Sequence, residues 1–239
     1  GHLGCYSFHE TKNIISGEGG ALLINDSSFF HRAEIIREKG TNRSSFFRGQ
    51  VDKYTWVDVG SSYLPGELIA AFLLAQMLDA KSITQKRISI WNKYHTSFQD
   101  SDKMHSIGLP TVPSGCIHNA HMYYLLLPDL DKRTSFISYM KKININCVFH
   151  YVPLHTSPQG KKIGICSGGL DVSNSIAGRI VRLPFWVDLS DQEQKKIINS
   201  TLNFENKRIF CCIQTSDNFL NFLIFYHPKT SDNFLKFLI

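Results

Sequence analysis

The strongest signal in the sequence is the stretch Cys5-Tyr-Ser-Phe-His-Glu-Thr-Lys12-Asn13, which Gly17-Glu-Gly-Gly20 follows. Lys12 lies among Ser, Thr, His and Asn, between two segments with the character of strands. The glycines give a flexible backbone that other groups can approach closely. A lysine amine becomes a nucleophile when burial or a nearby charge lowers its pKa. Lys12 is therefore a candidate nucleophile, although most lysines are solvated surface groups.

The composition is that of a globular protein. The chain has 239 residues, of which 43% are hydrophobic and 19% charged, and its net charge is +6. A positive charge suits an anionic partner, but no dense stripe of Lys and Arg with interleaved aromatic residues marks a nucleic-acid binder. No apolar run reaches the length of a membrane-spanning helix, and no signal peptide is recognisable. We therefore expect neither nucleic acid nor a membrane among the partners.

Cysteine usage and the first residues set two further expectations. The six cysteines are scattered and form no C-x-x-C pair, which favours a reduced compartment, the cytoplasm. The chain opens with Gly1-His-Leu-Gly4 and has no initial Met, and residues 3–8 have the character of a packed interior. We therefore expect the C-terminal part of a longer protein. The alternative, a processed precursor, has no cleavage signal in its favour.

Apolar patterning predicts the elements of the first half. Residues 20–25 predict a strand, and residues 28–39 predict a helix that ends at a glycine. Residues 41–63 form a long polar and aromatic loop, a kind of loop that is usually functional or interfacial. Pro65 can start the next helix, and residues 68–78 are apolar nearly all round, which predicts a buried helix. Over residues 79–98 apolar residues recur every three or four positions, which predicts an amphipathic helix joining two units.

Strands and helices alternate in the second half, which predicts an α/β or α+β arrangement. The predicted strands cover residues 122–127 and 145–152, the predicted helices 131–144, 173–179 and the segment after the capping box Ser190-Asp-Gln-Glu193, and the predicted loops 108–115 and 157–171.

The last stretch contains a repeat, because residues 215–224 recur almost unchanged as residues 230–239. Two copies are too few for a solenoid, which needs about three stacked units. We interpret residues 207–239 as an appended, repeat-containing tail of uncertain structure. Its apolar character makes it an aggregation hazard if it is exposed.

Several long motifs in order resemble the DegT/DnrJ/EryC1/StrS sugar aminotransferases. The resemblance covers about residues 1–205 and is closest to one branch, the dTDP-4-amino-4,6-dideoxygalactose transaminases. The motifs are residues 1–13, Gly17–Asn25, Arg32–Arg43, Phe47–Trp56, Gly60–Leu64, Asn119–Met122, Phe149–His155 and Arg182–Pro184.

The resemblance implies an α/β fold of the type I pyridoxal-phosphate-dependent transferases, which is the aspartate-aminotransferase-like fold. Residues 1–66 would be the C-terminal part of the large cofactor-binding domain, whose sheet is mainly parallel. Residues 67–206 would be the linking helix and a small α+β domain. Active sites of the family lie at the interface of a homodimer, so we expect a homodimer of the full-length parent.

The resemblance also implies site residues. Lys12 matches the lysine that binds pyridoxal phosphate as a Schiff base, and Ser7 matches a serine whose hydroxyl contacts the cofactor phosphate. Substrate contacts are expected from His150, Tyr151, His155 and Arg43. The sequence departs from the family where Leu64 replaces a phosphate-binding asparagine and where Gly66-Glu67 replaces Ser-Asp.

Non-functional, structural roles for these residues stay open. His150 and His155 have a spacing that could indicate a metal pair, but Pro153 breaks the helix that such a pair would need. His118 and His121 are more simply structural. Arg43, Arg48 and Lys53 could contact a nucleotide diphosphate, since arginine suits bidentate phosphate contacts, or they could belong to a solvated loop.

The implied reaction transfers an amino group from glutamate, which becomes 2-oxoglutarate, to a dTDP-4-keto-6-deoxy-hexose. Its setting would be the synthesis of a polysaccharide such as the enterobacterial common antigen. The acidic partner of the cofactor's ring nitrogen lies upstream in the family, so we expect the 239-residue chain alone to be inactive. Two alternatives stay open. A dehydratase of the family would carry His where Lys12 stands, and a non-catalytic remnant or binding module would need no complete site.

Overall fold

The structure is a computed structural model, and it describes residues 1–213. The chain begins with an antiparallel hairpin of β1 (Leu3–Ser7) and β2 (Gly20–Ile24), in which Leu3 pairs with Ile24 and Ser7 with Gly20. The hairpin confirms the strand predicted at residues 20–25. Its side chains are mostly exposed, so the packed interior expected for residues 3–8 is wrong for the described part of the chain.

A 3-10 helix and two short α-helices follow the hairpin. After the 3-10 helix η1 (Ser27–Phe29), α1 (Phe30–Arg37) ends near Gly40, and α2 (Arg43–Phe47) lies inside the segment predicted to be a loop. Gly40 has a φ of +75°, and a Cβ on it would overlap the carbonyl of Asp58. Only glycine therefore allows residues 57–61 to close over the end of α1.

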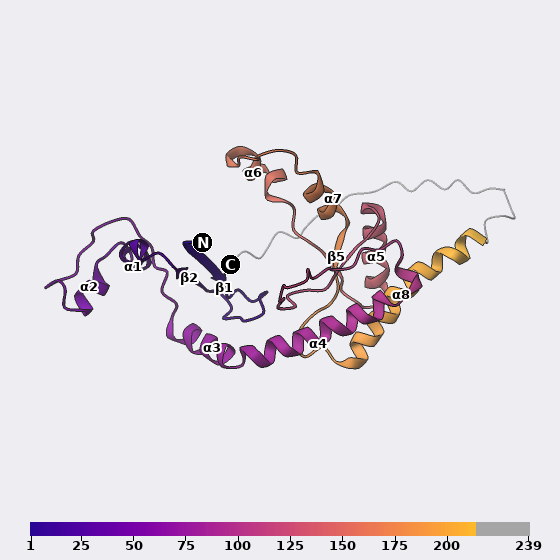
Figure 1. The fold of residues 1–239 in the computed structure, drawn as a ribbon, viewed down its shortest axis with the longest axis horizontal. Helices are drawn as coiled ribbons and strands as arrows, with labels where there is room; N and C mark the ends of the chain where they lie inside the picture. The colour runs from indigo at the N-terminus through magenta and orange to yellow at the C-terminus, as the bar shows by residue number, and fades with distance from the viewer. Residues whose placement is uncertain (214–239) are drawn as a thin grey trace, which may run out of the picture.

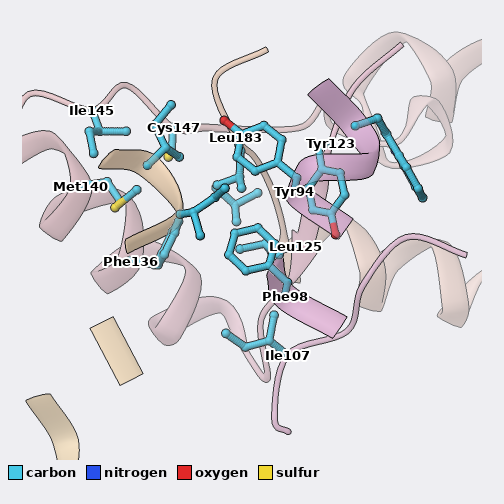
Figure 2. Packing of buried hydrophobic residues seen from close by; sticks show 14 of the residues in the cluster. Tyr94, Phe98, Ile107, Tyr123, Leu125, Phe136, Met140, Ile145, Cys147 and Leu183 are labelled. Atoms are coloured by element: carbon cyan, nitrogen blue, oxygen red, sulfur yellow. The ribbon is translucent and has the colours of Figure 1, made fainter. Parts of the chain in front are cut away.

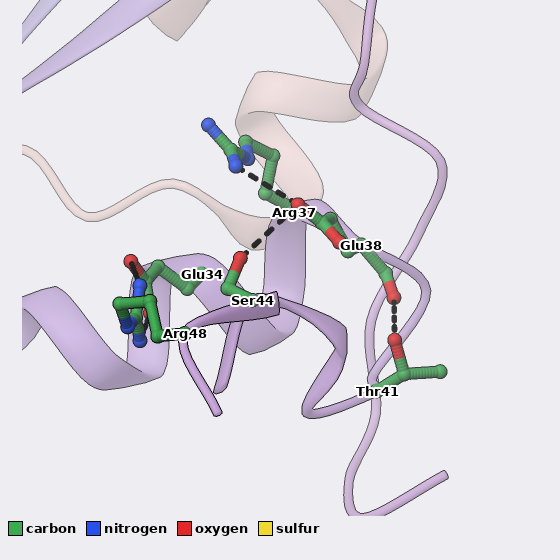
Figure 3. Close-up of polar contacts among 6 residues, drawn as sticks. All are labelled: Glu34, Arg37, Glu38, Thr41, Ser44 and Arg48. Carbon is green, nitrogen blue, oxygen red and sulfur yellow. Dashed lines mark hydrogen bonds and ion pairs between the residues drawn. The ribbon is translucent and has the colours of Figure 1, made fainter. Parts of the chain in front are cut away.

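Polar contacts fix α2 against α1, as Figure 3 shows. Arg48 donates two hydrogen bonds of 2.8 Å to the carboxylate of Glu34. Ser44 donates to Glu38, whose carbonyl accepts from Thr41. A bidentate arginine–carboxylate pair is directional, and it holds the pKa of Glu34 below its usual value.

Two consecutive helices connect the N-terminal elements to the rest of the chain (Figure 1). These are α3 (Glu67–Leu78) and α4 (Ala80–Gln99), which are separated at Asp79. The buried face of α4 follows the predicted periodicity, and Ile90, Tyr94 and Phe98 lie on it.

The prediction that the first of these helices is buried is wrong for the described residues. No residue of α3 is buried, and Leu68 and Leu74 are 88% and 61% exposed. Burial needs a partner surface as well as an apolar helix, and residues 1–213 bring α3 against little besides the start of α4.

The second half forms a three-stranded antiparallel sheet with helices on it. Strand β5 (Ile180–Arg182) lies between β3 (Tyr124–Leu126) and β4 (Val148–Phe149), and Val181 pairs with both Leu125 and Phe149. The strands are shorter than predicted, and β5 was not predicted. The remaining elements are η2 (Asp102–Met104), α5 (Leu130–Lys142), η3 (Leu154–Thr156), α6 (Pro158–Ile163), α7 (Asp171–Arg179) and α8 (Asp191–Ile213).

The predicted starts and ends of these helices hold in part. The capping box is confirmed, because the backbone and hydroxyl of Ser190 both donate to Glu193. Helix α6 lies in the predicted loop 157–171. Helix α8 continues to Ile213, past the predicted start of the tail, and the repeat lies outside the described residues. No helix within residues 1–213 is long and apolar enough to cross a membrane.

The core lies between the sheet and helices α4, α5 and α8 (Figure 2). Tyr94, Phe98 and Leu125 are fully buried and point toward one another. The Tyr94 hydroxyl donates to the carbonyl of Pro184 at 2.9 Å, which satisfies its one polar group. Burial raises the pKa of Cys147 to about 12, so this thiol is an inert part of the core.

Candidate functional site

The loop that carries Lys12 is closed at its base by backbone hydrogen bonds. Glu10 donates to the carbonyl of Gly17 at 2.8 Å, and Phe8 donates to the carbonyl of Gly19 at 2.8 Å. At its tip the amide of Lys12 donates to the carbonyl of His9 at 2.9 Å. The hairpin therefore presents Lys12 on a short, internally bonded loop.

Lys12 lines a cavity of about 640 Å³ to which distant parts of the chain contribute. The Lys12 loop forms one wall and α3 and α4 form another, and residues 121–122, 146, 148 and 182–188 form the rest. The lining mixes charge and aromatic surface. Its members include Lys12, Asn13, Ile83, Lys86, Arg87, His121, Arg182, Phe185, Trp186 and Asp188.

Arg87 is the buried charge of this cavity and is only 6% exposed. Its guanidinium donates to the carbonyls of Ala120 at 3.0 Å and His121 at 2.6 Å. It also lies over the ring of Phe185, 4.7 Å from the centroid. Hydrogen bonds and a cation–π contact compensate for the burial of this charge.

The positive charges of the cavity affect a neighbouring histidine. Burial lowers the pKa of His121, and the charges of Arg87 and Lys12 lower it further. His121 is therefore neutral at neutral pH. Arg182 adds another cation, and its Nε is buried without a hydrogen-bond partner among the described residues.

Asn13, next to Lys12, ties this loop to the second half of the chain. Its side-chain nitrogen lies 2.6 Å from the carbonyl oxygen of Asn119, and its side-chain oxygen lies 2.9 Å from Nδ1 of His121. The contacts span more than 100 residues of sequence, so they fix Lys12 relative to the small sheet and its helices.

The other predicted site residues lie elsewhere. Ser7 is the last residue of β1, and its hydroxyl accepts from the amide of His9. His150 and Tyr151 line a separate, mainly apolar cavity of about 300 Å³. His155 lies 2.8 Å from the side-chain oxygen of Asn174, and Arg43 lies over the ring of Phe47. The cofactor and substrate roles of these residues stay predictions.

Arg48 already has a partner in the structure, and its phosphate contact stays a prediction. Both of its terminal nitrogens are bonded to Glu34, and this pair raises the pKa of Arg48 above its usual value. A phosphate would have to compete with a bidentate carboxylate that is already in place.

Sequence reasoning missed Asn13, Arg87 and Arg182 as site residues. Arg87 had a usable signal, since it is a charge on the otherwise apolar stripe of the helix at 79–98. A charge at such a position must find partners when the stripe packs. Asn13 and Arg182 had no comparable local signal.

Comparisons with known proteins agree with the sequence motifs. The sequence model of the DegT/DnrJ/EryC1/StrS aminotransferase family matches residues 1–202. An uncharacterized protein of Methanocaldococcus jannaschii is 27% identical over 203 residues, which are 82% of this chain and 52% of that protein. The dTDP-4-dehydro-2,3,6-trideoxy-D-glucose 4-aminotransferase of Saccharopolyspora spinosa is 24% identical, over 82% of this chain and 51% of that enzyme.

A solved structure gives the same result. The crystal structure of a DegT DnrJ EryC1 StrS aminotransferase from Brucella abortus superimposes with a TM-score of 0.73 and 26% identity, covering 86% of this chain and 51% of that one. The expected type I transferase fold is confirmed. The chain spans about half the length of the curated relatives it matches. Because the family's sequence model covers residues 1–202, the chain belongs to the DegT/DnrJ/EryC1/StrS aminotransferase family.

Proposed function

We propose that this chain is the C-terminal part of a pyridoxal-phosphate-dependent sugar aminotransferase, in which Lys12 is the cofactor lysine. The observation that carries the proposal is the position of Lys12 in a polar cavity of about 640 Å³ within the fold of this family. We further propose a dTDP-4-keto-6-deoxy-hexose as substrate, as in the dTDP-4-amino-4,6-dideoxygalactose transaminases, and glutamate as amino donor. The Saccharopolyspora spinosa relative is a dTDP-sugar 4-aminotransferase, which supports this substrate class.

The residues around the cavity fit pyridoxal phosphate and its reactants. Lys12 offers the primary amine that a cofactor aldehyde requires, and Phe185 and Trp186 offer flat apolar surface beside it. Arg182 brings a guanidinium with an unpartnered, buried Nε, which suits a carboxylate or phosphate oxygen. When bound, the cofactor supplies an electron sink for the pair of electrons left at the donor's α-carbon.

Lys12 has two tasks in this proposal. Its amine would hold the cofactor, and its Nζ would accept the proton from the α-carbon of the donor. Ser7 would contact the cofactor phosphate, and His150, Tyr151, His155 and Arg43 would contact the sugar nucleotide. Cations along the cavity would orient the anionic reactants.

The whole protein's activity extends beyond this chain. Since the chain spans about half of its relatives, we propose that the acid facing the ring nitrogen comes from the rest of a longer parent. We also propose a homodimeric, cytoplasmic parent that serves polysaccharide synthesis, including the enterobacterial common antigen. The 239-residue chain alone is then inactive.

Amination of dTDP-4-keto-6-deoxy-glucose with glutamate tests the proposal, with the amino sugar detected by mass spectrometry. The parent should turn over, the chain alone should not, and Lys12→Ala in the parent should remove both turnover and the visible absorbance of the lysine-bound cofactor. Lys93→Ala is the matched control, because Lys93 is also a lysine of α4 but is outside the lining of this cavity and pairs with Asp191 at 2.6 Å. Turnover by the Lys12→Ala parent would sink the assignment of Lys12.

A second candidate is a non-catalytic remnant or binding module of the same fold. It is favoured by the half-length coverage of the relatives. Calorimetry with dTDP-sugar separates the two functions, since a binding module binds the nucleotide sugar without any lysine-bound cofactor.

A further inference from the structure

The asparagine that follows Lys12 has an orientation that chemistry fixes. A backbone carbonyl can only accept hydrogen bonds, so the group of Asn13 that lies 2.6 Å from the Asn119 oxygen must be its NH₂. The amide oxygen of Asn13 then faces Nδ1 of His121 at 2.9 Å. The flipped orientation would place two oxygens against each other on one side and the NH₂ against the imidazole on the other.

This orientation selects one form of His121. An amide oxygen is only an acceptor, so Nδ1 of His121 must carry a hydrogen and donate it. A neutral imidazole has one N–H, and therefore Nε2 carries the lone pair. The hydrogen-bond partner of one ring nitrogen thus decides whether the other nitrogen carries a hydrogen, as it does in metal and catalytic sites. Free neutral histidine prefers the opposite tautomer, with the hydrogen on Nε2.

The surroundings keep His121 neutral and in place. Arg87 donates to its carbonyl at 2.6 Å and to that of Ala120 at 3.0 Å, which fixes the backbone on which the ring stands. Ala120 has a positive φ of 48°, a conformation that this anchored turn maintains. The charged or titratable groups that act on the ring are Arg87, Lys12, Arg182 and His150. All of them disfavour a second proton.

We infer that Asn13 is a positioning residue, which holds His121 as the Nδ1–H tautomer and so leaves the Nε2 lone pair as an acceptor beside the Lys12 loop. Lys12 and His121 line the same cavity. The tautomer gives this cavity a neutral acceptor for an N–H or O–H of a bound reactant. This consequence rests on the proposed function, whereas the tautomer itself does not.

The tautomer can be measured by ¹⁵N-detected histidine NMR on the 239-residue chain without cofactor. The chain has ten histidines, and His121→Gln identifies the resonances of interest. In the wild type, Nδ1 of His121 should have the shift of a protonated nitrogen and Nε2 that of an unprotonated one. In Asn13→Ala the two shifts should exchange.

Asn25→Ala is the matched control, since the side chain of Asn25 likewise donates to a backbone carbonyl, that of Gly1 at 2.9 Å. It should leave the His121 shifts unchanged. A wild-type His121 with its hydrogen on Nε2 would overturn the inference, as would an unchanged pattern in Asn13→Ala. Because the experiment needs no turnover, failure of the proposed aminotransferase activity would not imitate either result. If Asn13→Ala does not fold, the wild-type spectrum decides, since the inference fixes which nitrogen of His121 carries the hydrogen.

Discussion

Replacing Arg87 with methionine tests whether the buried guanidinium holds the cavity wall together. Methionine keeps an unbranched apolar stem but has no donor, so Arg87→Met deletes the bonds to the carbonyls of Ala120 and His121. Hydrogen bonds to a charged group contribute about 1.5–3 kcal/mol each, or roughly 3–6 kcal/mol for two. The cation–π contact with Phe185 adds about 1 kcal/mol.

Removing the charge also removes the free-energy cost of burying it, which is several kcal/mol. This gain offsets part of the lost hydrogen bonds and cation–π contact, so we expect a net loss of about 2–3 kcal/mol in the free energy of unfolding. Urea denaturation followed by tryptophan fluorescence measures it. With a slope of about 2 kcal/mol per molar urea, the midpoint should fall by about 1–1.5 M at unchanged slope.

Lys86→Met, one residue earlier on α4, is the matched control and should change stability by less than about 0.5 kcal/mol. The pKa of His121 should also rise toward its ordinary value in Arg87→Met, because one of the charges that lower it has gone. An unfolding midpoint equal to that of the wild type would refute the role given to Arg87.

Two further predictions concern the core and the pH dependence of stability. Phe136 is fully buried and lies edge-on to Phe204 at 5.1 Å, so Phe136→Ala should cost about 3–5 kcal/mol of unfolding free energy; a loss below about 1 kcal/mol in urea denaturation would contradict this packing. The pKa values of His95, His121 and His150 are lowered in the folded chain, each first by burial. The unfolded chain therefore binds protons first, and stability should fall as pH drops below about 6.5; urea midpoints at pH 7.5 and 5.5 measure this, and equal midpoints would contradict it.

Local patterns predicted the helices well where one face meets a core. The stripe through Ile90, Tyr94 and Phe98 repeats with helical spacing, and those side chains are buried. The capping box at Ser190 was also readable, since its four residues interact with one another. The predicted burial of α3 was wrong because burial depends on a partner surface, which the sequence of the helix cannot specify. Strand β5 was not predicted because three residues give too little periodicity, and β4 was predicted within a strand that is too long for the same reason.

The candidate site was predictable only in part. The sequence motifs singled out Lys12, which does line the large cavity. Arg87, His121 and Arg182 reach that cavity from α4, the turn at 120–122 and β5, and no local pattern joins such distant positions. Arg48 shows the opposite difficulty. An arginine in a polar segment suits a phosphate contact, and only the fold shows that the Arg48 guanidinium is already hydrogen-bonded to Glu34.

Helix α4 runs from the core to the cavity, so a tilt at its core end also moves the cavity wall. Phe98 near one end is fixed in the core, and Arg87, eleven positions earlier, forms part of the cavity wall. At about 1.5 Å per residue these positions are roughly 16 Å apart along a stiff rod. A tilt of about 4° about the core end would therefore displace the wall by roughly 1 Å, an error that can cost a reaction about 100-fold in rate. Substitutions that shift Phe98 can therefore move the wall of the cavity that Lys12 lines without contacting Lys12.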